Sequence, residues 1–319
     1  MRKLLCALFL FAAGGVAEAA DTFLAGDVFA SVHSSTGTYQ QWRKVGATWT
    51  LIDTLVDTTS GGYTFGGAFD ASGDFYGTDS AAAALSKYEG PGTPHTRSNF
   101  GSASVATSIV FSSSGTMYVG SFFGTNGIRR IDAASGAVLQ TYGAGSVLYG
   151  MALAADQSTM YYTDFGAVRR WNVATNTQMT DLVTGLGADG VRVLGDGSVL
   201  VSAFTNIRRY SAAGALLQTY DVAGRDLWFG LDLNNDGTSF WGGDAGGTLY
   251  RFDILTGAVL DTFTTPGTGN RLYGVTVFGA GQFASVSAVP LPPAAWMGLA
   301  LLVGLGVMRR RRRLAPASA

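Results

Sequence analysis

A unit of about 40 residues repeats along most of this 319-residue chain, and the repeat limits what the chain can fold into. Each unit holds four short apolar segments separated by turn residues, as in residues 108–142. Four strands recurring with a period of about 40–50 residues are typical of β-propeller blades. The residue that closes each unit's first turn serves as a ruler. These positions are Gly73, Gly115, Gln157, Gly197, Gly237 and Gly281, with spacings of 42, 42, 40, 40 and 44 residues.

The composition also favours strands over helices. The chain has 45 glycines and only 13% charged residues, and a single glutamate lies beyond residue 20. Helix surfaces use Glu and Lys freely, whereas tight turns use Gly. We therefore predict an all-β body with the architecture of a β-propeller.

The two ends of the body are predicted to share one blade. Residues 27–32 match the second strand of a unit, and residues 38–44 and 49–56 match the third and fourth. The missing first strand is supplied by residues 274–278, far away in the sequence. Such closure removes exposed sheet edges. Counting the shared blade predicts six blades, with seven as the alternative because the first unit is irregular.

The first nineteen residues have the pattern of a secretory signal helix. A basic start is followed by the apolar residues 4–13 and by small residues at Ala17 and Ala19, which mark a cleavage site. We therefore predict export by the Sec machinery. The composition changes again after residue 286, so the predicted divisions are a signal peptide (1–19), a propeller (20–286) and a C-terminal segment (287–319).

The C-terminal segment combines a proline motif, an apolar run and an arginine block. Residues 294–308 are apolar and, with the preceding prolines, barely reach the roughly 17 residues of a transmembrane helix. The arginines would hold the end of this helix in the cytoplasm. The motif is Val289, Pro290, Leu291 and Pro292, and the block is Arg309, Arg310, Arg311, Arg312 and Arg313.

This order of parts resembles the PEP-CTERM sorting signal of Gram-negative bacteria, although Leu291 stands where that signal usually has an acidic residue. The resemblance implies recognition by an exosortase and cleavage near the proline motif. It also implies residence in the inner membrane during processing, then delivery to the cell surface or an exopolysaccharide matrix.

The sequence has no evident catalytic constellation. Its two histidines, His33 and His95, lie among polar turn residues and are expected to be loop residues. Asp232, Asn234 and Asp236 have the spacing of a calcium loop, but Gly243 stands at the twelfth position, where a bidentate Glu is expected. We interpret this run as a hairpin turn, with weak calcium binding as the alternative. No other cofactor is expected.

Basic residues recur in the third strand of the unit, at two neighbouring positions. We expect the first set to pair with polar residues two positions further on, because residues i and i+2 share a strand face. Arg129, Arg169 and Arg208 form the second set and are the better candidates for binding an acidic polysaccharide. The first set is Lys87, Arg130, Arg170, Arg209 and Arg251, with expected partners Glu89, Asp132, Asn172, Ser211 and Asp253.

The body between the two terminal segments carries 14 basic and 21 acidic residues, which argues against nucleic acid binding.

The segments IDAASGAVLQTY and FDILTGAVLDTF resemble repeats of YVTN-type and quinoprotein-like propellers, although Tyr142, Tyr220 and Phe263 replace the Trp of the quinoprotein motif. We expect a non-enzymatic binding or structural protein of the cell envelope or matrix. The alternative is a propeller lyase or lactonase with a divalent ion in the central channel.

Overall fold

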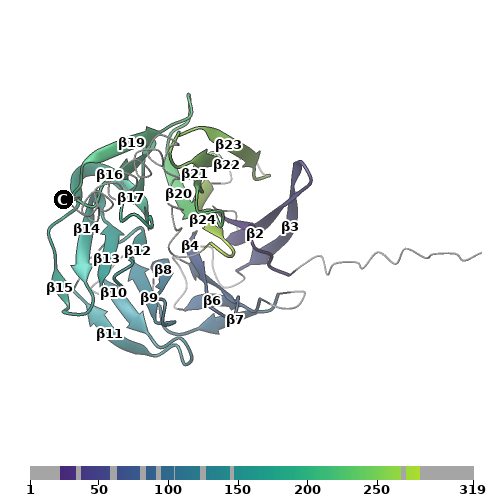
Figure 1. Cartoon of the computed structure of the whole chain (residues 1–319). Helices are drawn as coiled ribbons and strands as arrows, with labels where there is room; N and C mark the ends of the chain where they lie inside the picture. Colours follow the sequence, from purple (N-terminus) through teal and green to yellow (C-terminus); the bar gives the residue numbers. More distant parts are fainter. Residues whose placement is uncertain are drawn as a thin grey trace, which may run out of the picture.

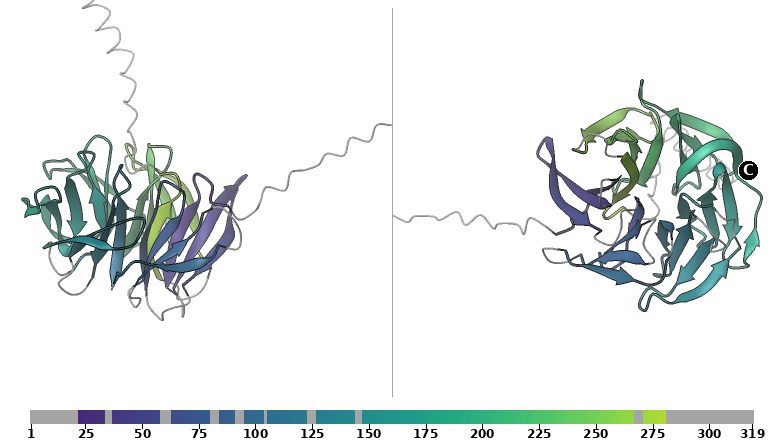
Figure 2. Two further views of the ribbon diagram at one scale, coloured as in Figure 1. Left: turned by 90° about the horizontal axis from the view of Figure 1, so that it is seen from below. Right: turned by 180° about the vertical axis from the view of Figure 1, so that it is seen from behind.

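A computed structural model describes residues 22–280 except 34–36, 58–62, 80–83, 91–94, 104, 123–126, 144–146 and 267–270. The described residues form strands and no helix, in agreement with the predicted all-β class. The sheets stand around a central axis like the blades of a propeller (Figure 1). A view turned by 90° shows a disc with loops on both faces (Figure 2).

The chain forms five antiparallel sheets, four of them with four strands. The first combines β24 (Arg271–Val277), β1 (Val28–His33), β2 (Thr38–Val45) and β3 (Thr48–Val56). The second runs β4 (Thr64–Phe69), β5 (Phe75–Asp79), β6 (Leu85–Tyr88) and β7 (Arg97–Phe100). The third runs β8 (Ala106–Phe111), β9 (Met117–Ser121), β10 (Ile128–Ile131) and β11 (Val138–Tyr142). The last is β20 (Trp228–Leu233), β21 (Ser239–Asp244), β22 (Thr248–Asp253) and β23 (Val259–Thr264).

The remaining sheet has eight strands and corrects the prediction of six separate blades. It joins β12 (Met151–Leu153), β13 (Thr159–Thr163), β14 (Phe165–Asn172) and β15 (Thr177–Gln178) to β16 (Val183–Val193), β17 (Val199–Ala203), β18 (Asn206–Tyr210) and β19 (Leu216–Tyr220). The first part of β16 pairs with β14 and its second part pairs with β17. Two sequence repeats therefore share one sheet, because the connection between them stays extended and hydrogen-bonded.

The predicted closure between the two ends of the body is confirmed. β24 pairs antiparallel with β1, with Val28 opposite Val277 and Ala30 opposite Val275. The backbone N–H of Gly26 also donates to the carbonyl of Phe278 at 2.9 Å. The ring of sheets is thus closed by strands from opposite ends of the sequence, and β24 pairs with the side of β1 that β2 leaves open.

Large aromatic side chains fill the spaces between neighbouring sheets. Trp42 of β2 packs against Phe263 of β23 with ring centroids 5.0 Å apart, and Trp241 of β21 packs against the same ring at 5.4 Å. Trp241 is only 1% exposed. Strands buried on both faces read as nearly continuous apolar runs, which explains why both sides of the repeat are apolar in the sequence.

The predicted signal peptide, proline motif, apolar run and arginine block lie outside the described residues. Within the described part of the chain, no helix is long and apolar enough to cross a membrane.

Candidate functional site: the mouth of the central channel

One position of the repeat recurs at or near the start of five inner strands and in the middle of β16, and it lines a cavity on the central axis. It lies eight residues before the ruler position in each unit and is followed by Gly in five units and by Ser108 in the sixth. The cavity at this level has a volume of only ≈ 30 Å³, which leaves room for no more than a few water molecules. We call this level the neck. Its six residues are Phe65, Thr107, Tyr149, Asp189, Phe229 and Tyr273.

A second ring of side chains lines the channel beyond the neck, three residues further along each inner strand. Residues three apart on a regular strand face opposite sides. In the inner strands both residues nevertheless line the channel, because the pairing register shifts between the two positions. The shift falls between Thr64 and Gly67 in β4 and between Ala188 and Val191 in β16. A β-bulge of this kind re-aims a side chain. The second ring is Ala68, Val110, Ala152, Arg192, Asp232 and Thr276.

The neck is narrow because the inner strands touch through their backbones. A Cβ atom on Gly274 would lie 2.0 Å from the carbonyl oxygen of Phe65, and one on Gly150 would lie 2.6 Å from that of Asp189. Hydroxyl groups of the second strands hold these contacts. Thr163 accepts a hydrogen bond from the N–H of Gly150 at 2.9 Å and donates to the carbonyl of Asp189. The neck is therefore a rigid part of the fold.

Seven aromatic rings form a closed circuit around the mouth on the neck side of the channel. We call this circuit the aromatic collar. Four rings come from the neck position, and the other three follow second strands or begin third strands. Centroid separations between successive rings run from 4.9 to 6.5 Å, within the range of favourable aromatic pairs. The circuit is Phe65, Phe122, Tyr149, Phe165, Phe204, Phe229, Tyr273 and back to Phe65.

The collar is held by backbone contacts and is partly open to solvent. The carbonyl of Phe204 accepts a hydrogen bond from the N–H of Leu227 in the next repeat, and the N–H of Phe122 donates to Val105 at 3.0 Å. Phe165 is 45% exposed, and it has a positive φ of 73°. Leu227 also has a positive φ, 61°. Such backbone conformations cost about 1–3 kcal/mol in non-glycine residues and cluster at functional sites.

Asp189 is the one acidic member of the neck. Its side chain has no hydrogen-bond or ion-pair partner among the described residues. Asp189 is half-buried and lines the neck cavity, and burial raises the pKa of its carboxyl well above the ordinary value of 3.8. Burial, and after it the charge of Asp189, also raises the pKa of the neighbouring Tyr149.

Arg192 and Asp232 form an ion pair across neighbouring repeats in the second ring. Arg192 Nε donates to Asp232 Oδ1 at 2.6 Å, and its Nη1 donates to the carbonyl of Val191 at 2.8 Å. Asp232 Oδ2 accepts the N–H of Val277 at 2.8 Å, which ties β20 to the closing strand β24. Arg192 lines both the neck and the space beyond it, so it separates the two parts of the channel.

The three residues of the predicted calcium loop have different surroundings. Asp232 faces the channel, whereas Asn234 and Asp236 belong to the turn after β20. Asn234 Nδ2 donates to Asp236 Oδ2 at 2.6 Å, and Asp236 accepts the N–H groups of Thr238 and Ser239 at 2.8 Å each. Within the described part of the chain, no three His, Cys, Asp or Glu side chains gather where they could hold a metal ion.

The first basic set has partners other than the expected ones. Lys87 pairs with Asp74 at 2.7 Å, Arg209 with Asp196 at 2.5 Å and Arg251 with Asp236 at 3.7 Å. These aspartates lie in the first turn of the same unit, which comes alongside the third strand in the hairpin. The acids two positions on accept backbone N–H groups of the next turn instead, as Asp132 does from Ser135 and Asp253 from Thr256. The expected i, i+2 pairing is therefore wrong at these positions.

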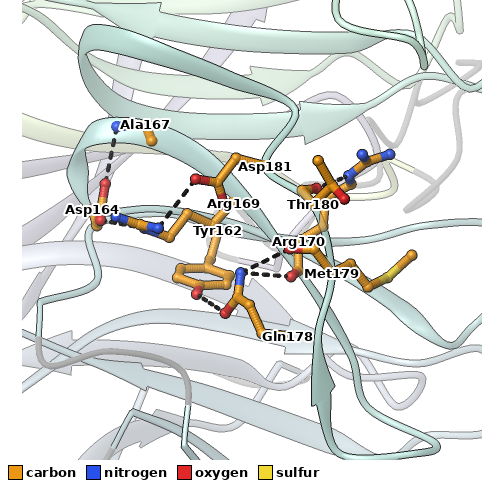
Figure 3. A network of polar contacts seen from close by, with 9 residues as sticks. All are labelled: Tyr162, Asp164, Ala167, Arg169, Arg170, Gln178, Met179, Thr180 and Asp181. Carbon is orange, nitrogen blue, oxygen red and sulfur yellow. Dashed lines mark hydrogen bonds and ion pairs between the residues drawn. The ribbon is translucent and has the colours of Figure 1, made fainter.

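The second basic set is engaged within the protein as well. Arg129 is buried, donates to Ser121 Oγ at 2.8 Å, and has its pKa lowered by burial. Arg169 pairs with Asp164 and, at 3.2 Å, with Asp181, as Figure 3 shows. Arg208 Nε donates to Asn206 Oδ1 at 2.7 Å. All three candidates for polysaccharide contacts thus already have partners.

Both histidines stack on aromatic rings. His33 lies 4.1 Å from Tyr63 and 6.3 Å from the collar ring Tyr273, measured between centroids. His95 stacks on Phe23 at 4.1 Å.

Sequence reasoning missed the collar, although four of its rings share one position relative to the ruler. The signal that marks it is an aromatic residue followed by glycine at the start of the inner strand.

Comparisons with known proteins support the fold. No protein-family model matches this chain, and no curated protein matches it either. Among solved structures, the nidogen/laminin complex contains a chain similar over 81% of this chain and all of its own length, with a TM-score of 0.61 and 16% identity. Hydrazine synthase of Kuenenia stuttgartiensis matches over 65% of this chain and 67% of its own, with a TM-score of 0.52 and 11% identity. Virginiamycin B lyase of Staphylococcus aureus matches over 66% and 73%, with a TM-score of 0.50 and 16% identity. The structural neighbours are β-propeller proteins that include both a binding protein and a lyase.

Proposed function

We propose that this chain is an exported, surface-sorted β-propeller that acts as a non-enzymatic binding protein of the cell envelope or exopolysaccharide matrix. The observation that carries the proposal is the closed circuit of seven aromatic rings around the channel mouth. Large aromatic faces bury much apolar area with little loss of side-chain entropy, and they suit the apolar faces of sugar rings. The narrow neck keeps such a ligand at the mouth.

The placement of the chain ends supports this use of the mouth. The described chain ends at Ala280, which lines the channel on the Arg192–Asp232 side, away from the collar. Its N-terminal end lies close by, because Gly26 bonds to Phe278. A tether leaving from this face would point the collar away from the surface to which the protein is attached.

The sorting part of the proposal comes from the sequence. The signal peptide would direct the chain to the Sec machinery, and Val289 to Pro292 would be presented to an exosortase while the apolar run and the arginines hold the tail in the inner membrane. Cleavage would then release the propeller to the surface or the matrix of a Gram-negative bacterium.

A glycan-array screen of the purified exported protein tests the binding role. We expect binding to one class of polysaccharide, and loss of it in a Phe165→Ala/Phe204→Ala double variant, because Phe165 is the exposed ring of the collar and Phe204 packs against it at 4.9 Å. A matched control is Leu139→Ala/Leu217→Ala, which removes two exposed apolar side chains on outer strands. Equal loss in both variants, or a product-releasing activity abolished by EDTA, would contradict the proposal and favour the lyase or lactonase alternative.

A further inference from the structure

The neck carries an ionisable carboxyl group at one position of the repeat. Four of its six residues are aromatic, one is Thr107, and Asp189 alone carries a carboxyl group. Tyr149 and Phe229 occupy the same position in the preceding and following repeats. Phe165 and Phe204, with centroids 4.9 Å apart, bridge the collar between them. A single residue with a carboxyl group therefore lines the neck, and collar rings from the repeats on both sides flank it.

Among the described residues, none forms an ion pair with this carboxyl group. Arg192 lies three residues further along β16 and lines the same cavity, but its Nε is bound to Asp232 and its Nη1 to Val191. The other ionisable side chains that line the neck are the phenols of Tyr149 and Tyr273, and a phenol carries no positive charge in either protonation state. A buried carboxylate is stable only with a partner of opposite charge or with donors that satisfy it.

We propose that the collar and Asp189 together bind an organic ammonium group, which on a sugar ligand is the free amine of a deacetylated amino sugar. This inference rests on the proposed function and names the class of its ligand. A flat circuit with the observed centroid spacings of 4.9 to 6.5 Å has a radius of roughly 6 Å. A cation displaced from the axis toward one side therefore comes within the distance of about 6 Å at which aromatic faces attract cations. Asp189 supplies the counter-charge from below.

A metal ion fits this place less well than an organic cation. Calcium takes six to eight oxygen ligands and magnesium an octahedron of them. The neck offers one carboxyl group and two phenol groups, because the hydroxyl of Thr107 is buried and donates to the carbonyl of Leu148 at 2.7 Å. The walls above it are aromatic rings. An ammonium group needs fewer oxygen ligands and gains from the rings, whose faces carry partial negative charge.

The test measures binding of methyl glucosaminide, methyl N-acetylglucosaminide and tetramethylammonium to the full-length protein by calorimetry at neutral pH. We expect the glucosaminide to bind at least about tenfold more tightly than its acetylated form, because a charge-assisted contact and several ring contacts are lost on acetylation. Tetramethylammonium binding without glucosaminide binding would also support the ammonium site and would identify its source as an alkylammonium compound.

Two variants separate recognition of charge from the shape of the mouth. Asp189→Asn keeps the size of the side chain and should weaken amine binding by about tenfold or more. Asp226→Asn removes an exposed acid on the loop leading to Phe229 and should leave binding unchanged. Equal affinity for the amine and its acetylated form, or no effect of Asp189→Asn, would overturn the ammonium proposal while collar-dependent glycan binding still stands. Absence of binding by every sugar and amine would overturn the ammonium site and the proposed function together.

Discussion

Replacing Asp27 with Asn should loosen the closure of the propeller. Asp27 is 1% exposed and lies just before β1, the strand that pairs with β24. Its carboxylate accepts the N–H of Leu24 at 2.8 Å, Gln41 Nε2 at 2.7 Å, and Arg43 Nε and Nη2 at 2.8 and 2.7 Å. One buried carboxylate therefore ties the N-terminal segment to β2 and fixes the start of β1.

The expected loss follows from the number and kind of these contacts. Removing one partner of a buried ion pair costs about 3–5 kcal/mol, because the other charge is left without compensation. Arg43 keeps 16% of its side chain exposed and can recover some hydration, so we take the lower end, about 3 kcal/mol. An Asn amide would also turn an N–H donor toward donors that the carboxylate now satisfies. For a domain of this size, this loss lowers Tm by about 6–12 °C.

Thermal and urea unfolding of the purified protein measure this effect. The matched control is Asp181→Asn, which breaks a pair with Arg169 that is 27% and 38% exposed and should cost no more than about 1 kcal/mol. A double-mutant cycle with Arg43→Gln then isolates the coupling between Asp27 and Arg43. If Asp27→Asn is no more destabilising than the control, the closure does not depend on this buried carboxylate and our account of it is wrong.

Three further predictions concern the neck and the tail. Gly274→Ala should destabilise the protein by about 1–3 kcal/mol or more, since its Cβ would meet the carbonyl of Phe65, whereas Gly143→Ala has no neighbour closer than 3.8 Å and should be tolerated in urea unfolding. Asp189→Asn should raise Tm at neutral pH. The folded state holds the Asp189 proton more tightly than the unfolded state, so the wild type loses stability as pH rises above the ordinary pKa of 3.8, and the advantage of the variant should vanish below it. Intact mass of the protein from its native host should show a product ending near Pro290; a chain that keeps Arg313 and fractionates with the inner membrane would show an anchor instead.

Much of the fold could be predicted because each repeat contains recognisable short patterns of turn residues and apolar residues. Turn residues and apolar runs located the strands of the first sheet to within a few residues, and the incomplete first unit predicted the pairing of β24 with β1. The merging of two repeats was not predictable in this way. Residues 183–188 contain glycines at 185 and 187 and resemble a turn, yet they continue β16 as a strand. Tertiary contacts outweigh weak local preference here.

The side-chain partners were harder to predict than the strands. The i, i+2 rule placed Asp132 beside Arg130, but a carboxylate at the start of a tight turn satisfies its backbone N–H groups first. The collar was missed for a different reason. Phe122, Phe165 and Phe204 lie far apart in sequence and outside the inner strands. Only the arrangement of the repeats around the channel brings these rings between the neck residues. The register shift that lets Asp189 and Arg192 line the same channel also cannot be predicted from the pattern of apolar residues.

The departures from the repeat converge on β16. This strand joins two repeats into one sheet, and it carries Asp189 in the neck and Arg192 in the second ring. The other charged residue of the two rings, Asp232, is bound to Arg192 from the next repeat. Natural proteins depart from their local sequence patterns mainly at functional sites, where the surrounding structure must stabilise the unusual residue. Asp189 lies at the register shift of β16, and the paired residues Ala188 and Val191 on either side of it support this exception. The continuous β16 therefore explains how one repeat can place a carboxyl group among aromatic rings while its neighbours place aromatic side chains at the same position.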